Sequence, residues 1–444
     1  MTPARRRLVI VVRADPVICG HSGEARNLAE VALTRGFDDV RLLTWPIDTL
    51  QAAGLPLKPL DRLLPYSDGI TVERPGAVGD YRVPDGRHLA GLTGRLVELL
   101  SDGVPTTCLS MYLVPHTQVV LDAVTAARAA GFAPDVRTVA KAVGSDVTNV
   151  IRSCLREGRF GAATVLFTTY LANDEVVAVS EYTRDEIVAS AEEVDARCGT
   201  TFAEQCRRRV TVSYPPIDSS AYLDLDLMQV DDALARRGLQ RDGYVLFLSR
   251  VARAKGIFDL LAAYGQMRCR ANVKLVVAGS GPALEHARAM AKDDDRIVFL
   301  TDVDDNEKPL LMRGCAAYVL PTKPEPDFVE TFGIALAEKM LAGGGPIVTT
   351  LTGGTGEAVG DTAVIVEPAD APALAAAVDR VVLAMPAADR RDLEARARAR
   401  ALTFDRVAVF DGLFPQALPP ARSRHLATAS GPSLHSRAEV EGLV

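Results

Sequence analysis

Two basic side chains, Arg250 and Lys255, stand five residues apart directly after an apolar run. The stretch reads SRVARAKG, and the run before it, residues 244–250, has the composition of a buried strand. Arg250 ends that strand, and Lys255 and Gly256 stand where the next helix is expected to begin. Cations and backbone N–H groups at a helix N-terminus bind phosphate, so the pair suits a diphosphate ligand. Taken alone, an R-x4-K pair also fits an ordinary solvated loop.

A glycine-rich turn, GSGP at 279–282, follows the next apolar run of the chain, residues 273–279. Gly279 and Gly281 would let a ligand approach the backbone closely. The turn lacks the third glycine and the ribose-binding acid of a full dinucleotide fingerprint. A tight turn is therefore the simpler interpretation when this motif stands alone.

Two glutamates, Glu330 and Glu338, lie eight residues apart in FVETFGIALAEKM. Gly333 suits a turn into a helix, and the backbone N–H groups of Phe332, Gly333 and Ile334 would then face a ligand. Two helical turns would place Glu338 about 12 Å along the axis from Glu330. Carboxylates accept paired hydrogen bonds from vicinal hydroxyls, which both a sugar and a ribose offer. The alternative is a capping acid and an unrelated surface acid.

These motifs require a scaffold that brings several strand ends together, and the hydrophobic pattern predicts one. Short apolar runs alternate with helical patterns, which predicts an α/β fold with mainly parallel strands. In the first half the expected strands are residues 7–12, 39–45, 105–112, 135–140, 175–180 and 209–213. In the second half they are residues 244–250, 273–279, 296–301, 316–322, 346–350 and 363–368. Ligands of such sheets bind beyond the carboxyl ends of the strands, where the motifs above stand.

The pattern predicts two doubly wound, Rossmann-like domains that face each other across a deep cleft. The expected bounds are 1–214 for the first domain and 244–417 for the second domain with its closing helices, joined by a proline-led acidic linker, 215–243. Residues 46–103, rich in Pro, Gly and Asp, are expected to form an irregular insert that shapes the cleft. Residues 418–444 have the composition of a disordered tail.

The composition disfavours some classes of ligand and indicates the cellular compartment. The net charge of −7 and the pI of about 5.5 disfavour a nucleic-acid-binding face. The seven cysteines form no C-x-x-C pair, so free thiols in a reducing cytoplasm are expected, with neither disulfides nor a zinc site. No apolar stretch reaches the ~20 residues of a membrane-spanning helix. The apolar run at 8–12 is too short for a signal peptide.

As a set, the motifs resemble the donor domain of retaining GT-B glycosyltransferases of the family-4 type. That domain carries a G-R…K-G segment, a G-x-G-P turn, an E-x7-E motif that begins E-x-F-G, and a following G-G…E. The corresponding residues here are Ser249-Arg250…Lys255-Gly256, the turn at 279–282, Glu330 to Glu338, and Gly353-Gly354…Glu357. The resemblance spans residues 244–400.

The first half resembles the same family more loosely. GHSGEARNLAEVAL resembles the family's first glycine-rich loop, which implies Gly20 and Gly23 as donor contacts, and VGSDVTNV (143–150) resembles an H-G-S-D-type stretch. Many members place His where this chain has Val143, so another histidine is expected to supply that contact. The residues expected to contact the sugar or the acceptor are His21, His116, Ser145 and Asp146.

The resemblance implies a retaining glycosyltransferase that moves a sugar from a nucleotide-diphosphate sugar to a small-molecule acceptor, without a metal or other cofactor. Arg250 and Lys255 would neutralise charge on the departing diphosphate. Glu330 would hold the donor sugar and Glu338 the ribose. The arginine-rich composition suggests an actinobacterial pathway of secondary metabolism, such as antibiotic biosynthesis, in the cytoplasm; a homodimer is one state the enzyme would allow.

Three alternatives stay open. One concerns the substrates: an S-glycosyltransferase of the lincosamide type, which joins a GDP-octose to ergothioneine. A second is a catalytically silent protein that binds a sugar nucleotide. A third is an NAD-dependent oxidoreductase, because α/β alternation fits that class as well, although the dinucleotide fingerprint is incomplete.

Overall fold

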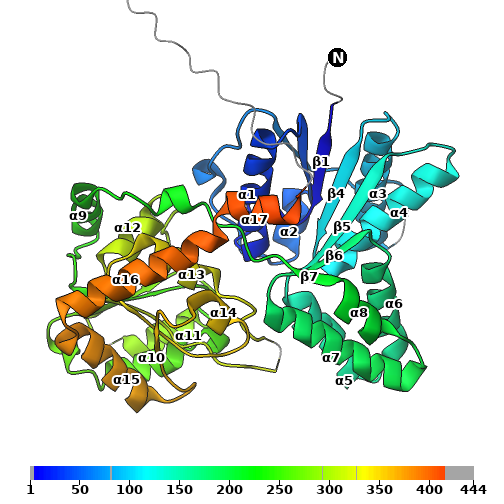
Figure 1. Ribbon diagram of the computed structural model, residues 1–444. Helices are drawn as coiled ribbons and strands as arrows, with labels where there is room; N and C mark the ends of the chain where they lie inside the picture. Colours follow the sequence, from blue (N-terminus) through cyan, green and yellow to red (C-terminus); the bar gives the residue numbers. More distant parts are fainter. Residues whose placement is uncertain (1–4, 81–82, 293, 327, 416–444) are drawn as a thin grey trace, which may run out of the picture.

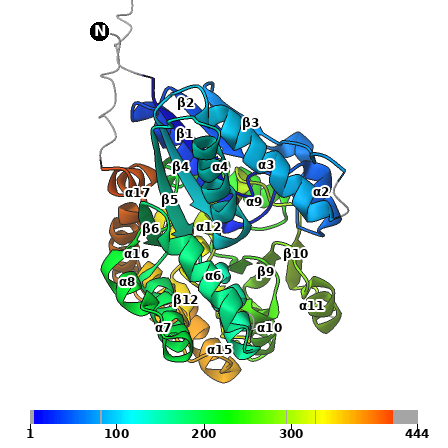
Figure 2. The ribbon, with the colours of Figure 1, turned by 90° about the vertical axis from the view of Figure 1, so that its right-hand side faces the viewer.

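The computed structural model describes residues 5–80, 83–292, 294–326 and 328–415 (Figure 1). Each half of the chain forms one parallel β-sheet that carries helices on its faces, as Figures 1 and 2 show. The prediction of two doubly wound α/β domains is thereby confirmed. The predicted tail, 418–444, lies outside the described residues.

The first sheet has the strand order β3-β2-β1-β4-β5-β6-β7, with all pairs parallel. Its strands are β1 (Arg7–Val11), β2 (Asp39–Leu43), β3 (Ile70–Glu73), β4 (Thr106–Met111), β5 (Val136–Ala142), β6 (Glu175–Ala178) and β7 (Val210–Val212). Its helices are α1 (Gly20–Thr34), α2 (Ile47–Ala52), α3 (Pro84–Leu100), α4 (Gln118–Ala129), α5 (Arg152–Arg156), α6 (Phe160–Leu171), α7 (Glu181–Cys198) and α8 (Phe202–Arg209). The direction of winding reverses between β1 and β4, which defines the switch point of this sheet.

The second sheet has the order β10-β9-β8-β11-β12-β13, again parallel, with its switch point between β8 and β11. Its strands are β8 (Tyr244–Leu248), β9 (Lys274–Ala278), β10 (Ile297–Leu300), β11 (Ala317–Leu320), β12 (Ile347–Thr349) and β13 (Val364–Ile365). Its helices are α10 (Ile257–Tyr264), α11 (Leu284–Ala291), α12 (Glu307–Gly314), α13 (Ile334–Ala342), α14 (Thr355–Val359), α15 (Ala371–Asp379) and α16 (Ala387–Ala401).

The linker and the last helix differ from the predicted domain bounds. Residues 215–243 contain a helix, α9 (Leu227–Arg236), whose Val230 and Leu234 are buried in the core of the second domain. The final helix, α17 (Arg406–Leu413), returns to the first domain and lies beside α1 (Figure 1). Its Phe410 packs against Phe37 with ring centroids 6.2 Å apart. The last residues of the predicted 244–417 domain therefore pack on the first domain and not on the second.

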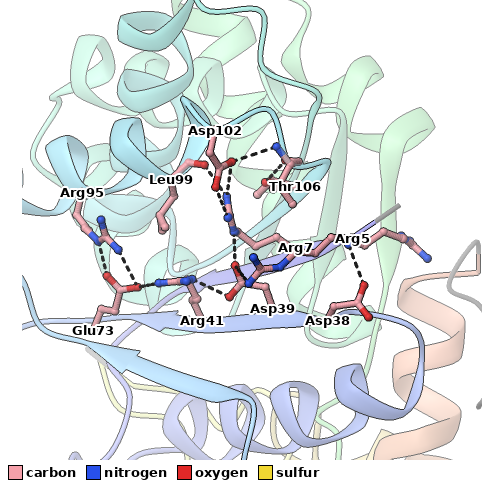
Figure 3. A network of polar contacts seen from close by, with 12 residues as sticks. Arg5, Arg7, Asp38, Asp39, Arg41, Glu73, Arg95, Leu99, Asp102 and Thr106 are labelled. Carbon is pink, nitrogen blue, oxygen red and sulfur yellow. Dashed lines mark hydrogen bonds and ion pairs between the residues drawn. The ribbon is translucent and has the colours of Figure 1, made fainter. Parts of the chain in front are cut away.

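Residues 46–103 are not the irregular insert that was predicted, because they add an edge strand and a long helix to the first sheet. Figure 3 shows the ion pairs that hold both elements: Glu73 of β3 accepts hydrogen bonds from Arg41 of β2 and from Arg95 of α3. Buried Arg7 of β1 pairs with Asp102, just after α3, at 2.5 Å. The Pro, Gly and Asp content of the segment suggested a loop, whereas its ion pairs attach β3 and α3 to the sheet.

All seven cysteines are free thiols, as predicted. Within the described ranges, no single helix has the length and apolar composition that crossing a membrane requires; one sharply bent pair, residues 371–384 and 387–404, meets those criteria only when taken together.

Candidate active site

The predicted basic pair lies at the switch point of the second sheet. Arg250 follows β8 and Lys255 ends a short 3-10 turn before α10. Both sit over the ring of Phe328, with the Arg250 Cζ 5.3 Å and the Lys255 Nζ 5.0 Å from its centroid. Lys255 also pairs with Glu330, whereas exposed Arg250 has no carboxylate partner among the described residues. Gly256 is required here, because a Cβ would lie 1.9 Å from the Pro321 carbonyl oxygen.

The G-x-G turn supports the loop that carries Arg250. A Cβ on Gly279 would lie 2.2 Å from the Ser249 carbonyl oxygen, and one on Gly281 would lie 2.4 Å from that of Val251. The Val251 amide also donates to the Ser280 carbonyl at 2.8 Å. These contacts explain both glycines by close packing of two backbones. Their predicted contact with the donor stays a prediction.

The two glutamates are not separated by two helical turns. Residues 329–333 are irregular, and α13 begins only at Ile334 after Gly333, whose φ is 96°. Only the segment from Ile334 to Glu338, with a rise of about 6 Å, is helical, so the expected two helical turns between the glutamates are wrong. Each glutamate instead has its own lysine, Lys255 for Glu330 and Lys308 for Glu338.

The start of α13 presents unpaired backbone amides. Among the described residues, the N–H groups of Phe332, Gly333 and Ile334 donate to no protein acceptor. The Phe332 side chain is 2% exposed and packs against Tyr214 and Phe404, with ring centroids 5.4 and 4.9 Å away. Only the backbone of Phe332 is therefore available to a ligand. Unpaired amides at a helix N-terminus are groups that can bind an anion, and we call these three amides the candidate anion site.

Glu338 is fixed by two residues that the sequence motifs did not indicate. The Lys308 Nζ lies 2.7 Å from its carboxylate. Tyr222 lies within hydrogen-bonding reach, and burial together with Glu338 raises the pKa of the Tyr222 phenol well above its usual value. Lys308 is thirty positions from Glu338 and Tyr222 still further, so no local pattern marks either of them.

The first glycine-rich loop meets α13 across the two domains. A Cβ on Gly20, at the start of α1, would lie 3.1 Å from the Ile334 Cδ1, whereas Gly23 faces open space. The VGSD loop does the same, because a Cβ on Gly144 would lie 2.3 Å from the Thr331 Cγ2. We call these facing loops, residues 20–23, 143–146 and 330–334, the domain junction. Ser145 is half-buried there, beside the phenol of Tyr112.

Asp146 and Val143 stabilise the VGSD loop from inside the first domain. The Asp146 carboxylate is buried and accepts hydrogen bonds from the amides of Leu113, Val143, Gly144 and Val147 at 2.9–3.2 Å. Burial raises its pKa to about 6, against the opposing effect of those amides. The Val143 side chain lies in the core. Asp146 is thus a loop-organising residue, which disfavours its predicted contact with a substrate.

The two candidate histidines are in different situations. The Trp45 indole donates to the His116 Nε2 at 3.0 Å, so the Nδ1 N–H donates to the Met111 carbonyl at 2.6 Å. Burial lowers the pKa of His116 to about 4, and neither ring nitrogen remains for a ligand. The ring nitrogens of His21, next to Gly20 at the domain junction, have no partner within the described part of the chain. The geometry therefore disfavours His116 and leaves His21.

Two further polar contacts join the domains. Glu357 of α14 accepts hydrogen bonds from the amides of Glu181 and Tyr182 at the start of α7, both at 2.7 Å. Lys58, from the 46–103 segment, lies 2.7 Å from Asp305 of the second domain. Glu357 belongs to the G-G…E motif, but the sequence alone gave it no role.

Two parallel Rossmann-like sheets that meet at their switch-point loops define the GT-B fold. The Anabaena HepE protein, solved with UDP and glucose, aligns with a TM-score of 0.66 and 17% identity over 92% of this chain and 98% of that one. A glycosyltransferase from Rickettsia africae aligns with a TM-score of 0.67 and 13% identity over 93% and 98%.

The sequence comparisons match the second domain. Residues 234–400 match the family model described as glycosyl transferases group 1. A glycogen synthase of Mycobacterium tuberculosis is 36% identical over 178 residues, 38% of this chain and 41% of the relative. A D-inositol 3-phosphate glycosyltransferase of Nocardioides sp. is 28% identical over 246 residues, 50% and 52%. The matches thus span about two fifths to one half of these relatives.

Proposed function

We propose that the protein is a retaining glycosyltransferase that moves a sugar from a nucleotide-diphosphate sugar to a small-molecule acceptor. The observation that carries this proposal is the candidate anion site at the start of α13, where three unpaired amides stand in the same loop cluster as Arg250 and Lys255. A diphosphate there would meet both cations and the helix dipole. The group 1 family match of residues 234–400 supports the same assignment.

Each charged residue has a distinct proposed task. Arg250, exposed and without a carboxylate partner in the described ranges, would take the charge that grows on the departing diphosphate. Lys255 would share its charge between the diphosphate and Glu330, which would hold the sugar's hydroxyls. Glu338, oriented by Lys308, would accept hydrogen bonds from the ribose. The departing oxygen would take the acceptor's proton on the same face of the sugar, which retains the anomeric configuration.

A thermal-shift panel with UDP, GDP, ADP and dTDP tests donor binding and identifies the base. UDP is the first candidate, because HepE was solved with it. Glu338→Ala should mainly weaken nucleotide binding, whereas Arg250→Ala should mainly slow transfer. Arg253→Ala is the matched control, because Arg253 lies on the same turn but over Phe258. Wild-type nucleotide affinity and turnover in both site variants would contradict the assignment.

The panel also separates the alternatives. Stabilisation by NAD(P) but by no nucleoside diphosphate would favour an oxidoreductase. Nucleotide binding without turnover of any sugar donor, across several acceptors, would favour a silent binding protein. A selective response to GDP would favour an S-glycosyltransferase of the lincosamide type, and with it a role in cytoplasmic secondary metabolism.

A further inference from the structure

The switch point of the first sheet carries a second cation above an aromatic ring. Arg13 follows β1 and Tyr112 follows β4, two strands that pair in parallel up to Val11 and Ser110. The Arg13 Cζ lies 5.5 Å from the centroid of the Tyr112 ring. Tyr112 has a φ of 83°, which is uncommon for a residue other than glycine and is found mostly where a site holds the backbone in place.

Among the described residues, Arg13 has no acidic partner, unlike Arg7 of β1 and Arg26 of α1. Arg7 pairs with Asp39 and Asp102, and Arg26 pairs with Asp15 at 2.9 Å. Within the described part of the chain, half-buried Arg13 has neither an ion pair nor a side-chain hydrogen bond. A guanidinium presents a planar fork of donors that matches a carboxylate or a phosphate.

His21, near Arg13, is held in its neutral form. Burial first, and then Arg13, His116 and Lys141, lower the pKa of His21 to about 3, and no acid contributes to that shift. His21 is therefore neutral at physiological pH and can donate one ring N–H. Its ring lies 5.9 Å from that of Tyr112. One charged donor and two neutral ones thus converge at the end of β1 and β4.

The second sheet repeats this arrangement. Arg250 follows β8, and its guanidinium lies over Phe328, which follows β11, at the other switch point. In the proposed function, Arg250 binds the diphosphate of the donor. Within the described ranges, each switch point therefore offers an unpaired guanidinium over an aromatic ring, and Arg13, at the switch point of the first sheet, has no assigned ligand.

We propose that Arg13, Tyr112 and His21 form an anion subsite that binds a carboxylate or phosphate group of the acceptor. The inference rests on the proposed function, because it assigns the donor to the switch point of the second sheet and the acceptor to that of the first sheet. The Arg13 fork would bind the anion in bidentate fashion, and the Tyr112 hydroxyl and the His21 N–H would complete its hydrogen bonds. Acceptors that carry such a group should be used in preference to their uncharged counterparts.

The single tryptophan provides the readout. Trp45 donates to His116, which feels the charge of Arg13, so its fluorescence should respond to an anion bound at Arg13. The full-length protein is titrated with inorganic phosphate and, separately, with succinate. The variants are Arg13→Ala, Arg13→Lys and Tyr112→Phe, with a melting curve for each variant. Arg6→Ala is the matched control, because the Arg6 guanidinium also lies over an aromatic ring, that of Phe37, in the same domain.

The expected result is that Arg13→Ala weakens binding of at least one probe about tenfold or more, as loss of a charge-assisted contact predicts. Arg13→Lys should lose less, Tyr112→Phe a few-fold, and Arg6→Ala almost nothing. The probe that binds identifies the group as phosphate or carboxylate. Absence of binding to the wild type, equal binding by wild type and Arg13→Ala, or equal losses in Arg13→Ala and Arg6→Ala would overturn the proposal.

The nucleotide panel keeps the two proposals separable. If no nucleoside diphosphate binds but anion binding depends on Arg13, the donor assignment fails and the subsite stands. If nucleotides bind through Arg250 while Arg13 has no effect on phosphate or succinate, the subsite fails and the proposed function stands.

Discussion

Glu357 joins the two domains through a helix cap, and its removal should loosen their closed arrangement. Its carboxylate accepts hydrogen bonds from the Glu181 and Tyr182 amides, both at 2.7 Å. The Ser180 hydroxyl accepts from the Thr183 amide at 3.1 Å, within the same domain. The cap of α7 is therefore divided between the two domains, and Glu357 supplies the part that is lost when they separate.

The magnitude follows from two contributions. Loss of a capping side chain costs about 1 kcal/mol, and loss of a negative charge at a helix N-terminus costs about 1 kcal/mol more. Together, about 2 kcal/mol corresponds to a roughly 30-fold shift of the closure equilibrium toward the open form. Arg400 donates to the backbone carbonyls of Glu357 and Ala358, so α14 itself should keep its place in Glu357→Ala.

Hydrogen exchange and solution scattering would measure the effect. In Glu357→Ala the amides of Glu181 and Tyr182 should exchange faster, and the radius of gyration should rise; Glu357→Gln, which keeps one acceptor oxygen, should show about half the free-energy change. Asp226→Ala is the matched control, because Asp226 caps α9 by accepting from Met228 within the second domain. Unchanged exchange at 181–182 in Glu357→Ala, or equal expansion of the control, would refute the reasoning.

Three further outcomes are expected. Lys308→Met should weaken nucleoside diphosphate binding about fivefold by calorimetry, because Glu338 loses its ion pair; unchanged affinity would separate Glu338 from the donor site. Gly144→Ala should lower kcat/KM by about tenfold or more, because its Cβ overlaps Thr331, and Thr331→Ala in the same chain should restore part of the loss. The pKa of His116 is about 4 in the fold against 6.5 when exposed, so the unfolded chain binds more protons between these values. The contribution of His116 to stability should therefore fall by about 3 kcal/mol as pH drops from 6.5 to 4. The difference in unfolding free energy between the wild type and His116→Gln, from denaturant titrations, should change by that amount in this window.

The strands were predictable because parallel strands covered on both faces read as short apolar runs. All five residues of β1 are buried, as are four of five in both β8 and β9. The edge strand β3 was missed, because its sequence ITVE is only partly buried. Helix α3 was missed for another reason: Leu92, Leu96 and Leu99 do have helical spacing, but the helix also contains Gly86, Gly91 and Gly94, which lower its helical propensity.

The site was predictable wherever a local motif forces a turn, and not where a partner comes from afar. Gly333 opens α13 with a positive φ, as the E-x-F-G pattern indicated. Lys308 and Glu357 take their roles from contacts with residues 30 and more than 170 positions away. Val143 stands where many members of the family have a histidine, and only the structure shows that its side chain is buried in the core of the first domain.

The contacts between the two domains indicate that closure of the domains and assembly of the site are one event. Glu357, Asp305 and Thr331 of the second domain, and Gly144 of the first, stand on segments that follow strands, and ligands of doubly wound sheets bind beside such segments. The same loops that hold the domains together thus supply the candidate anion site at α13. A substitution that weakens closure should therefore slow transfer even where it touches no substrate, and it should do so in proportion to the open fraction it creates. Glu357, which touches no predicted ligand, is the position where this coupling can be measured apart from binding.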